Sequence, residues 1–211
     1  MAQHRRFDDC DEWKAIGHHS LVRFRPREKP TSETSKVTLS VARKAVDGKL
    51  ASALGDAYAC CAALVGLRLG PGSKDGQLDL MLLGRSGAVA LGECKLLRTK
   101  SRGSAVQRAS QQLEGYERVT RGQDAAWLRN RIEDSYARFG FPSLSELVTT
   151  IGVEAEEEQV RWWSVVADNI QRGNFGMFIA TRSRGESVIN LYRCSSGSSD
   201  QEPFCLHTES E

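Results

Sequence analysis

The sequence predicts an α/β protein in which helices flank a mixed central sheet. Apolar residues recur at helical spacing over 41–64, and two apolar-rich strands follow at 77–84 and 88–96. Two more strands, at 176–181 and 187–192, come after a helical region. Because helices and strands alternate along the chain, we expect the helices to cover the faces of one sheet.

The length and composition are typical of a globular protein. The chain has 211 residues, 40% hydrophobic and 27% charged, with 29 Lys and Arg against 27 Asp and Glu. No stretch approaches the ~18 apolar residues of a transmembrane helix, and the charged N-terminus is unlike a signal peptide. The six cysteines form no C-x-x-C pair, which favours reduced thiols. We therefore expect a cytoplasmic protein without a membrane partner, with delivery into another cell left open.

The chain divides into three parts by composition. Residues 1–35 are polar and contain two prolines, which predicts a partly irregular N-terminal arm. Residues 36–194 are expected to form the domain, with a helical insertion at about 122–172. The Ser- and Gly-rich segment 195–211 is expected to be a flexible tail.

Each expected helix has its own signal. Over 41–64, apolar residues recur at intervals of three and four, and glycines follow. Over 105–119, small and apolar residues share one face after a polar loop at 100–104. Three further helices are expected at 125–139, 143–151 and 156–170, the second beginning with the capping box Ser143–Glu146.

The two strands at 77–84 and 88–96 are expected to form a hairpin around Arg85-Ser86-Gly87. Glycine suits the last loop position because that position requires a positive φ. If Gly84 pairs with Ala88, the numbers of opposite residues sum to 172. Asp79 then lies opposite Glu93.

Three charged residues interrupt these otherwise apolar strands. Strand side chains alternate between faces, so Glu93 and Lys95 point the same way. Two carboxylates at opposite positions repel each other, so Asp79 and Glu93 require a compensating cation. Lys95 is one candidate and a divalent metal is the other, since Mg²⁺ prefers carboxylate, water and phosphate oxygens. An ordinary hairpin with an exposed ion pair is the alternative, although charges within apolar strands are costly unless paired.

The spacing Asp79, thirteen residues, then Glu93-Cys94-Lys95 resembles the D…(D/E)xK signature of the PD-(D/E)XK nuclease superfamily. Leu78 stands where the literal signature has proline. Downstream, Gln112-Leu113-x-x-Tyr116 resembles the QxxxY element that several of those families carry on the next helix.

This resemblance implies a restriction-endonuclease-like fold and a Mg²⁺ or Mn²⁺ cofactor. It implies that Asp79 and Glu93 are metal ligands, with the Cys94 backbone carbonyl as a further ligand. Lys95 would be the catalytic lysine, and Gln112 an accessory active-site residue. An acidic residue on the first helix is common in the superfamily, but neither Asp47 nor Asp56 is well placed for it.

A basic segment follows the hairpin. Residues 95–131 contain nine basic and three acidic side chains, a balance that favours a polyanionic ligand. Arg98, Lys100 and Arg102 directly follow the second strand and are expected to contact phosphates at the mouth of the site.

The expected function is therefore metal-dependent hydrolysis of phosphodiester bonds, with DNA as the expected substrate and RNA as an alternative. Two other interpretations stay open. One is a toxin or defence effector of the same fold, which would have an immunity or regulatory partner protein. The other is a catalytically inactive binding module. A homodimer would help to cut both strands of a duplex.

Overall fold

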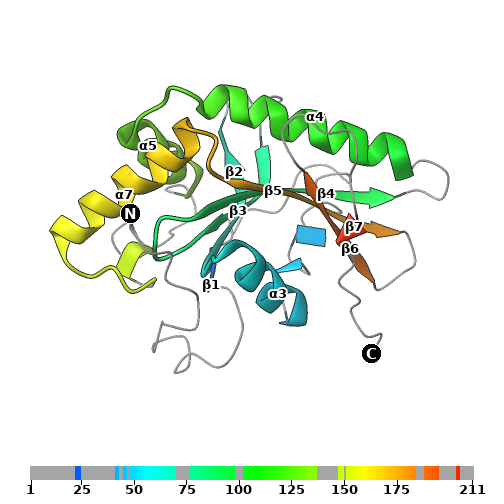
Figure 1. The fold of residues 1–211 in the computed structure, drawn as a ribbon, viewed down its shortest axis with the longest axis horizontal. Helices are drawn as coiled ribbons and strands as arrows, with labels where there is room; N and C mark the ends of the chain where they lie inside the picture. Colours follow the sequence, from blue (N-terminus) through cyan, green and yellow to red (C-terminus); the bar gives the residue numbers. More distant parts are fainter. Residues whose placement is uncertain are drawn as a thin grey trace.

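The computed structural model shows an α/β protein with a seven-stranded mixed sheet (Figure 1). It describes residues 22–24, 41–42, 45–46, 48–69, 77–97, 102–136, 147–149, 151–183, 188–194 and 203–204. The strands lie in the sheet in chain order: β1 (Val22–Phe24), β2 (Ala62–Arg68), β3 (Gln77–Leu83), β4 (Val89–Leu97), β5 (Gly176–Ser183), β6 (Ile189–Cys194) and β7 (Pro203–Phe204). The prediction of a mixed sheet flanked by helices is confirmed.

Helices cover both faces of this sheet. Helix α3 (Gly48–Tyr58) lies on one face, and α4 (Arg102–Thr120) crosses the opposite face (Figure 1). Helices α5 (Ala125–Tyr136) and α7 (Glu156–Gln171) pack beside α4. Within the described part of the chain, no helix has the length and apolar character needed to cross a membrane.

The strand pairing is parallel at two positions and antiparallel elsewhere. Strand β2 pairs in parallel with β1, and β4 in parallel with β5. The remaining neighbours, β2–β3, β3–β4, β5–β6 and β6–β7, are antiparallel. A parallel pair requires a long crossover, and the crossover between β4 and β5 includes α4, α5 and α7.

The predicted hairpin is confirmed in both strands and register. Leu80 pairs with Gly92 and Leu83 with Val89, so partner numbers sum to 172. The Gly84 amide donates to the Ala88 carbonyl at 2.8 Å, and Gly87 has a φ of 82°. The turn chemistry of Arg85-Ser86-Gly87 therefore fixes which residues lie opposite each other.

The expected helix at 41–64 is wrong over its last six residues. Helix α3 ends at Tyr58, Ala59 takes a φ of 51°, and the Cys60 amide donates to the Gly55 carbonyl at 3.0 Å. This is a helix end of the kind usually made with glycine. Strand β2 follows and is buried on both faces, so its apolar residues do not alternate with polar ones. Without alternation, the run was indistinguishable from a buried helix.

Other boundaries also differ from the expectations. Helix α4 begins at Arg102, inside the expected loop at 100–104, and the expected arm and tail contain strands β1 and β7. The capping box at Ser143 and the acidic candidate Asp47 lie outside the described residues. Asp56 lies on α3, but its side chain is not described.

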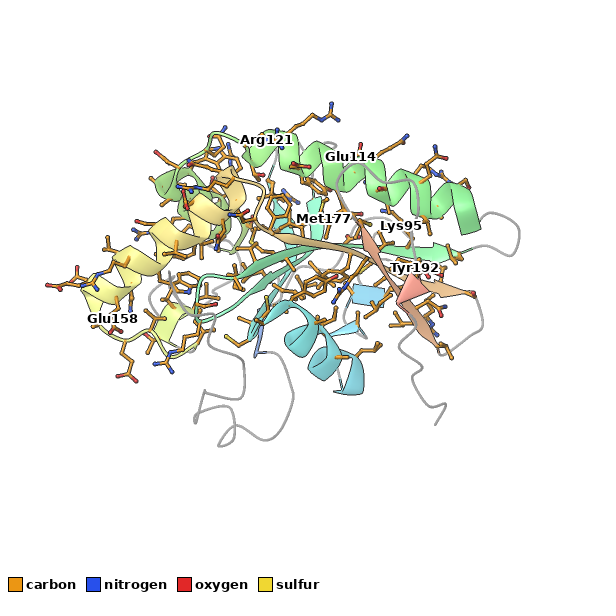
Figure 2. The ribbon with its side chains drawn as sticks, viewed as in Figure 1. Lys95, Glu114, Arg121, Glu158, Met177 and Tyr192 are labelled. Atoms are coloured by element: carbon orange, nitrogen blue, oxygen red, sulfur yellow. The ribbon has the colours of Figure 1, made fainter. Side chains whose placement is uncertain are left out.

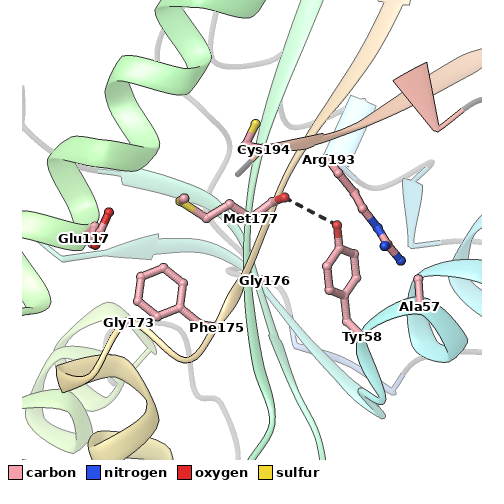
Figure 3. Close-up of a pocket in the computed structure, with 9 residues that line it drawn as sticks. All are labelled: Ala57, Tyr58, Glu117, Gly173, Phe175, Gly176, Met177, Arg193 and Cys194. Carbon is pink, nitrogen blue, oxygen red and sulfur yellow. Dashed lines mark hydrogen bonds between the residues drawn. The ribbon is translucent and has the colours of Figure 1, made fainter. Parts of the chain in front are cut away.

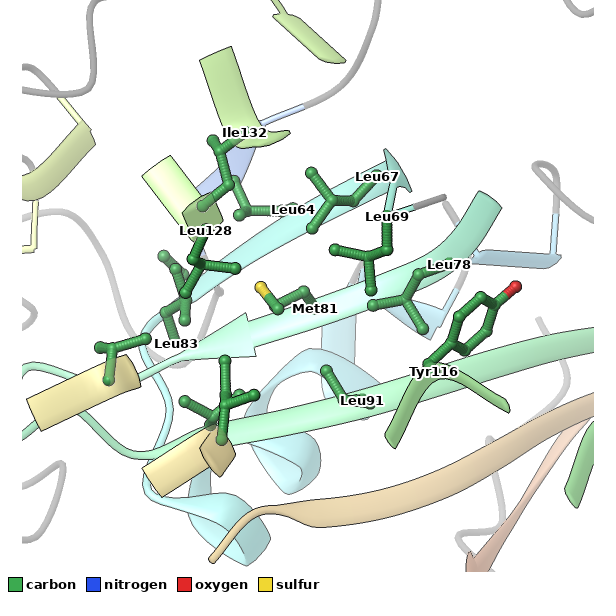
Figure 4. Close-up of a cluster of buried hydrophobic side chains, with 14 of the residues drawn as sticks. Leu64, Leu67, Leu69, Leu78, Met81, Leu83, Leu91, Tyr116, Leu128 and Ile132 are labelled. Atoms are coloured by element: carbon green, nitrogen blue, oxygen red, sulfur yellow. The ribbon is translucent and has the colours of Figure 1, made fainter. Parts of the chain in front are cut away.

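Two apolar clusters, one on each face of the sheet, form the core. The larger lies between the sheet and α4, α5 and α7, and it includes Met81, Leu91 and Leu128 (Figure 4). The smaller lies under α3 and includes Leu54 and Phe178. Along β4 the side chains alternate between these clusters, so Leu91 faces α4. Along β3, Met81 faces α4 and so does Leu78, so the alternation is interrupted between them.

Gly92 on β4 leaves room for the Phe178 ring of β5. A Cβ atom at position 92 would lie 2.3 Å from the Phe178 Cζ atom. We expect Gly92→Ala to destabilise the protein by about 1–3 kcal/mol, the usual effect of overpacking a core. The free energy of unfolding from urea denaturation measures this effect.

Gly115→Ala is the matched control for that substitution. Gly115 lies within α4, and a Cβ atom there meets nothing within 4 Å. Alanine should stabilise this helix by about 0.5–1 kcal/mol. Equal effects of the two substitutions would contradict the packing argument.

Candidate active site

The β3–β4 hairpin brings Asp79 and Glu93 to neighbouring positions. The backbone pairing of the two strands ends at Leu80 and Gly92, and extending that register by one step would place Asp79 opposite Glu93. The Asp79 Oδ2 atom accepts a hydrogen bond from the Cys94 amide at 2.8 Å. The Asp79 side chain thus accepts the hydrogen bond of the Cys94 amide at the point where regular backbone pairing between β3 and β4 ends.

Lys95 is paired with Glu93 on the same face of β4. The Lys95 Nζ atom donates to Glu93 Oε2 at 2.6 Å. The side chain of Glu93 is 1% exposed and that of Lys95 is 20% exposed. The pair is therefore not the fully solvated surface ion pair of the alternative interpretation. Figure 2 shows Lys95 on the sheet beneath α4.

Helix α4 places Tyr116, rather than Gln112, against this region. The Tyr116 hydroxyl donates to the Gln77 carbonyl at 2.8 Å, two residues before Asp79. Tyr116 is 5% exposed, whereas Gln112 is exposed to solvent. The buried tyrosine is therefore the residue of the Gln-x-x-x-Tyr element that holds the start of β3.

Burial and mutual repulsion shift the pKa values of the two carboxyl groups. Burial, together with the charge of Asp79, raises the pKa of Glu93 to about 8, and Lys95 opposes this shift. Burial also raises the pKa of Asp79, although the Cys94 amide and Lys95 lower it. Two interacting carboxyl groups titrate as a pair, so the metal-free site retains a proton near neutral pH.

Burial also raises the pKa of Tyr116, and the charges of Glu93 and Asp79 add to the shift. Tyr116 therefore stays a neutral phenol that donates a hydrogen bond. Burial likewise raises the pKa of Cys94. Its thiol faces the α3 side of the sheet, as expected for a small packing residue.

The raised pKa of Glu93 predicts a pH-dependent stability. Between the usual glutamate pKa of 4.5 and about 8, the folded protein binds one more proton than the unfolded chain. The free energy of unfolding of the metal-free protein should therefore fall as pH rises, by at most about 1.4 kcal/mol per pH unit. Urea denaturation at pH 5, 6, 7 and 8 in EDTA measures this slope.

Glu93→Gln isolates the contribution of this one group. The variant cannot ionise at position 93, so its stability relative to the wild type should increase with pH over that range. Glu114→Gln, at an exposed position on α4, is the matched control. A slope that Glu93→Gln does not change would assign the pH dependence to other groups.

The site offers oxygen ligands to a hard metal ion. In the part of the chain that the structure describes, no group of three or more His, Cys, Asp or Glu side chains surrounds a common point. Asp79 and Glu93 supply two carboxylates, and Glu93 Oε1 is buried with no hydrogen-bond partner among the described residues. Because the amide and carbonyl of one strand residue point to the same side, the Cys94 carbonyl also faces β3. This donor set fits Mg²⁺, which completes its coordination with water and phosphate.

The expected phosphate contacts are untested. Arg98 and Lys100 lie outside the described residues, and Arg102 is the first residue of α4, without a described side chain.

Thr181 on β5 lies at the site, although the sequence analysis did not single it out. It is the register partner of Lys95 and is fully buried. Threonine is common in β-strands, so its presence in the sequence of β5 does not indicate whether the side chain packs in the core or belongs to a site.

A pocket of about 340 Å³ lies at the start of β5 (Figure 3). Its lining includes Tyr58, Phe175 and Arg193. The Tyr58 hydroxyl donates to the Met177 carbonyl at 3.4 Å, and the Arg193 guanidinium lies 5.8 Å from the centre of the Tyr58 ring. The pocket does not include the carboxylate pair.

Comparisons of the chain with models of known protein families, with curated proteins and with solved structures found no match. The case for a function therefore depends on the geometry of the chain itself.

Proposed function

We propose that this protein is a Mg²⁺- or Mn²⁺-dependent nuclease of the PD-(D/E)XK type that hydrolyses phosphodiester bonds in DNA. One observation carries the proposal. The interacting carboxyl groups of Asp79 and Glu93 lie on adjacent strands, Glu93 buried and Asp79 half-buried, and Lys95 is bonded to Glu93 at 2.6 Å. A protein gains no stability from two adjacent acidic groups in its interior, so their placement favours a ligand-binding role.

The surroundings of the hairpin support a restriction-endonuclease-like fold. The hairpin follows α3 in the chain and precedes α4. Helix α4 packs against β4, and its Tyr116 contacts the start of β3. The superfamily resemblance implies this placement of a helix across the active-site strands.

Asp79, Glu93 and the Cys94 carbonyl would hold the metal ion. Bound there, the ion would lower the pKa of a water molecule and neutralise charge on the phosphoryl group. Burial of the carboxyl groups, together with the charge of Asp79 beside Glu93, keeps a proton in the metal-free site. This proton must leave for both carboxylates to act as ligands.

Lys95 has two roles in this proposal. In the metal-free protein its ammonium group balances the carboxylates. During hydrolysis it orients the attacking water or donates a hydrogen bond to a phosphoryl oxygen, where negative charge develops in the transition state. Its partial exposure, 20% of the side chain, keeps the ammonium group accessible to a substrate.

A metal-titrated cleavage assay on supercoiled plasmid and linear DNA tests the proposal. We expect cleavage that requires Mg²⁺ or Mn²⁺ and stops in EDTA. The Lys95→Ala variant, purified identically, reports any contaminating nuclease. The absence of both cleavage and metal binding in the wild type would refute the proposal and leave a binding module.

The same assay addresses the substrate class and the biological role. A structured RNA, tested in parallel, shows whether the enzyme distinguishes the two nucleic acids. Toxicity of the wild type but not of Lys95→Ala during expression would favour the effector interpretation.

A further inference from the structure

Two buried polar atoms on neighbouring strands lack a hydrogen-bond partner among the residues that the structure describes. They are Glu93 Oε1 on β4 and Thr181 Oγ1 on β5. Buried polar groups in folded proteins are nearly always hydrogen-bonded, to protein or to water. Two such exceptions in one region require an explanation.

Both atoms belong to the same face of the sheet. Strands β4 and β5 are parallel, with Glu93 beside Ile179 and Lys95 beside Thr181. Ile179 belongs to the apolar cluster under α4. Because strand side chains alternate, Thr181 points to the same side as Ile179. Glu93, Lys95 and Thr181 therefore occupy adjacent positions on the face that α4 covers.

The spacing suits one bridging water molecule. Thr181 lies one strand across and two residues along from Glu93, so the Cβ atoms of the two residues are about 8 Å apart. The two side chains shorten the distance between their oxygen atoms. One water molecule that bonds to both oxygens bridges an oxygen-to-oxygen distance of about 5.5 Å. A buried water requires two to four polar partners, and the Lys95 ammonium group, which has three N–H donors, is adjacent.

We propose that Glu93 Oε1 and Thr181 Oγ1 form a binding site for a single water molecule beside Lys95. We further propose that Thr181 is a positioning residue for hydrolysis, because it holds this water at the carboxylate pair. The second statement rests on the proposed nuclease function; the first does not. The hydroxyl suits this position because it both donates and accepts a hydrogen bond, whereas valine has the same shape and does neither.

The water site is tested in the metal-free wild-type protein by NMR. The γ-methyl group of Thr181 should show a nuclear Overhauser effect to a bound water. The methyl group of Ala180, next in the chain but buried in the apolar cluster on the opposite face of the sheet, should show none. If Thr181 shows no such effect, the water site is refuted, whatever the protein does to DNA.

The positioning role is tested with Thr181→Val and Thr181→Ser. We expect Thr181→Val to reduce kcat for cleavage about tenfold with little change in KM, and Thr181→Ser to restore most of it. The melting temperature of metal-free Thr181→Val should not fall, because the methyl group replaces a hydroxyl that has no partner among the residues the structure describes. A fall in melting temperature together with kcat, or no effect on kcat, would overturn the positioning role. If the bound water is present but no protein cleaves DNA, the water site is supported and the nuclease proposal fails.

Discussion

Lys95→Ala should reduce the rate of DNA cleavage by about 10²–10³-fold, the usual loss when one donor to a developing oxyanion is removed. The variant also removes the donor that lies 2.6 Å from Glu93 Oε2. Without Lys95, the pKa of Glu93 should rise above its value of about 8, so the residue is protonated at neutral pH and binds a cation more weakly. We therefore expect a weaker affinity for Mn²⁺ as well as slower cleavage. Initial rates at saturating metal separate the two effects.

The control for this variant is Arg108→Ala. Arg108 is an exposed cation on α4, and its loss changes the net charge by the same amount. It should leave the rate at saturating substrate nearly unchanged, and circular dichroism should show both variants folded. If Lys95→Ala retains more than a third of the wild-type rate, the reaction does not take place at this site.

Trp162→Ala should lower the free energy of unfolding by about 3–5 kcal/mol, as expected for removing a large buried aromatic side chain. Trp162 is 4% exposed and packs edge-on against Trp163, with ring centres 4.7 Å apart. Its Nε1 atom donates to the Gly84 carbonyl at 3.0 Å, which ties α7 to the turn of the β3–β4 hairpin. Urea denaturation at a fixed pH measures the loss.

Two further variants separate packing from hydrogen bonding at that position. Trp162→Phe keeps an aromatic ring but removes the donor, and the lost hydrogen bond should contribute about 0.5–1.5 kcal/mol of its total cost. Val160→Ala, on the same helix at a side chain that is 58% exposed, should change stability by less than about 0.5 kcal/mol. If Trp162→Ala costs no more than Val160→Ala, α7 does not anchor the hairpin.

The local parts of the site were predictable because neighbouring residues determine them. The glycine turn fixes the hairpin register, and the register brings Asp79 to the part of β4 that carries Glu93 and Cys94. Alternation along β4 then places Lys95 on the same face as Glu93. The burial of both Trp162 and Trp163 does not follow from neighbouring residues in this way. The face of α7 that is buried depends on its packing against the turn at Gly84, which is far away in the chain.

The remaining features depend on contacts between segments far apart in the chain. Strand β2 carries no alternation because both of its faces are covered, so the sequence alone suggested a longer helix. The Gln-x-x-x-Tyr motif does not indicate which of Gln112 and Tyr116 faces the site. The packing of α4 against the sheet buries only Tyr116. Thr181 lies beside Lys95 only because β5 returns in parallel to β4.

This parallel return also determines the order in which the site can form. A hairpin such as β3–β4 closes within microseconds because its strands are adjacent in the chain. Pairing of β4 with β5 must bring together strands separated by residues 98–175, and such long-range closures are slow. Asp79 and Glu93 therefore meet early, while water still surrounds them and both remain ionised. Docking of β5 and α4 is the late step that removes this water, so refolding near neutral pH should take up a proton at that stage.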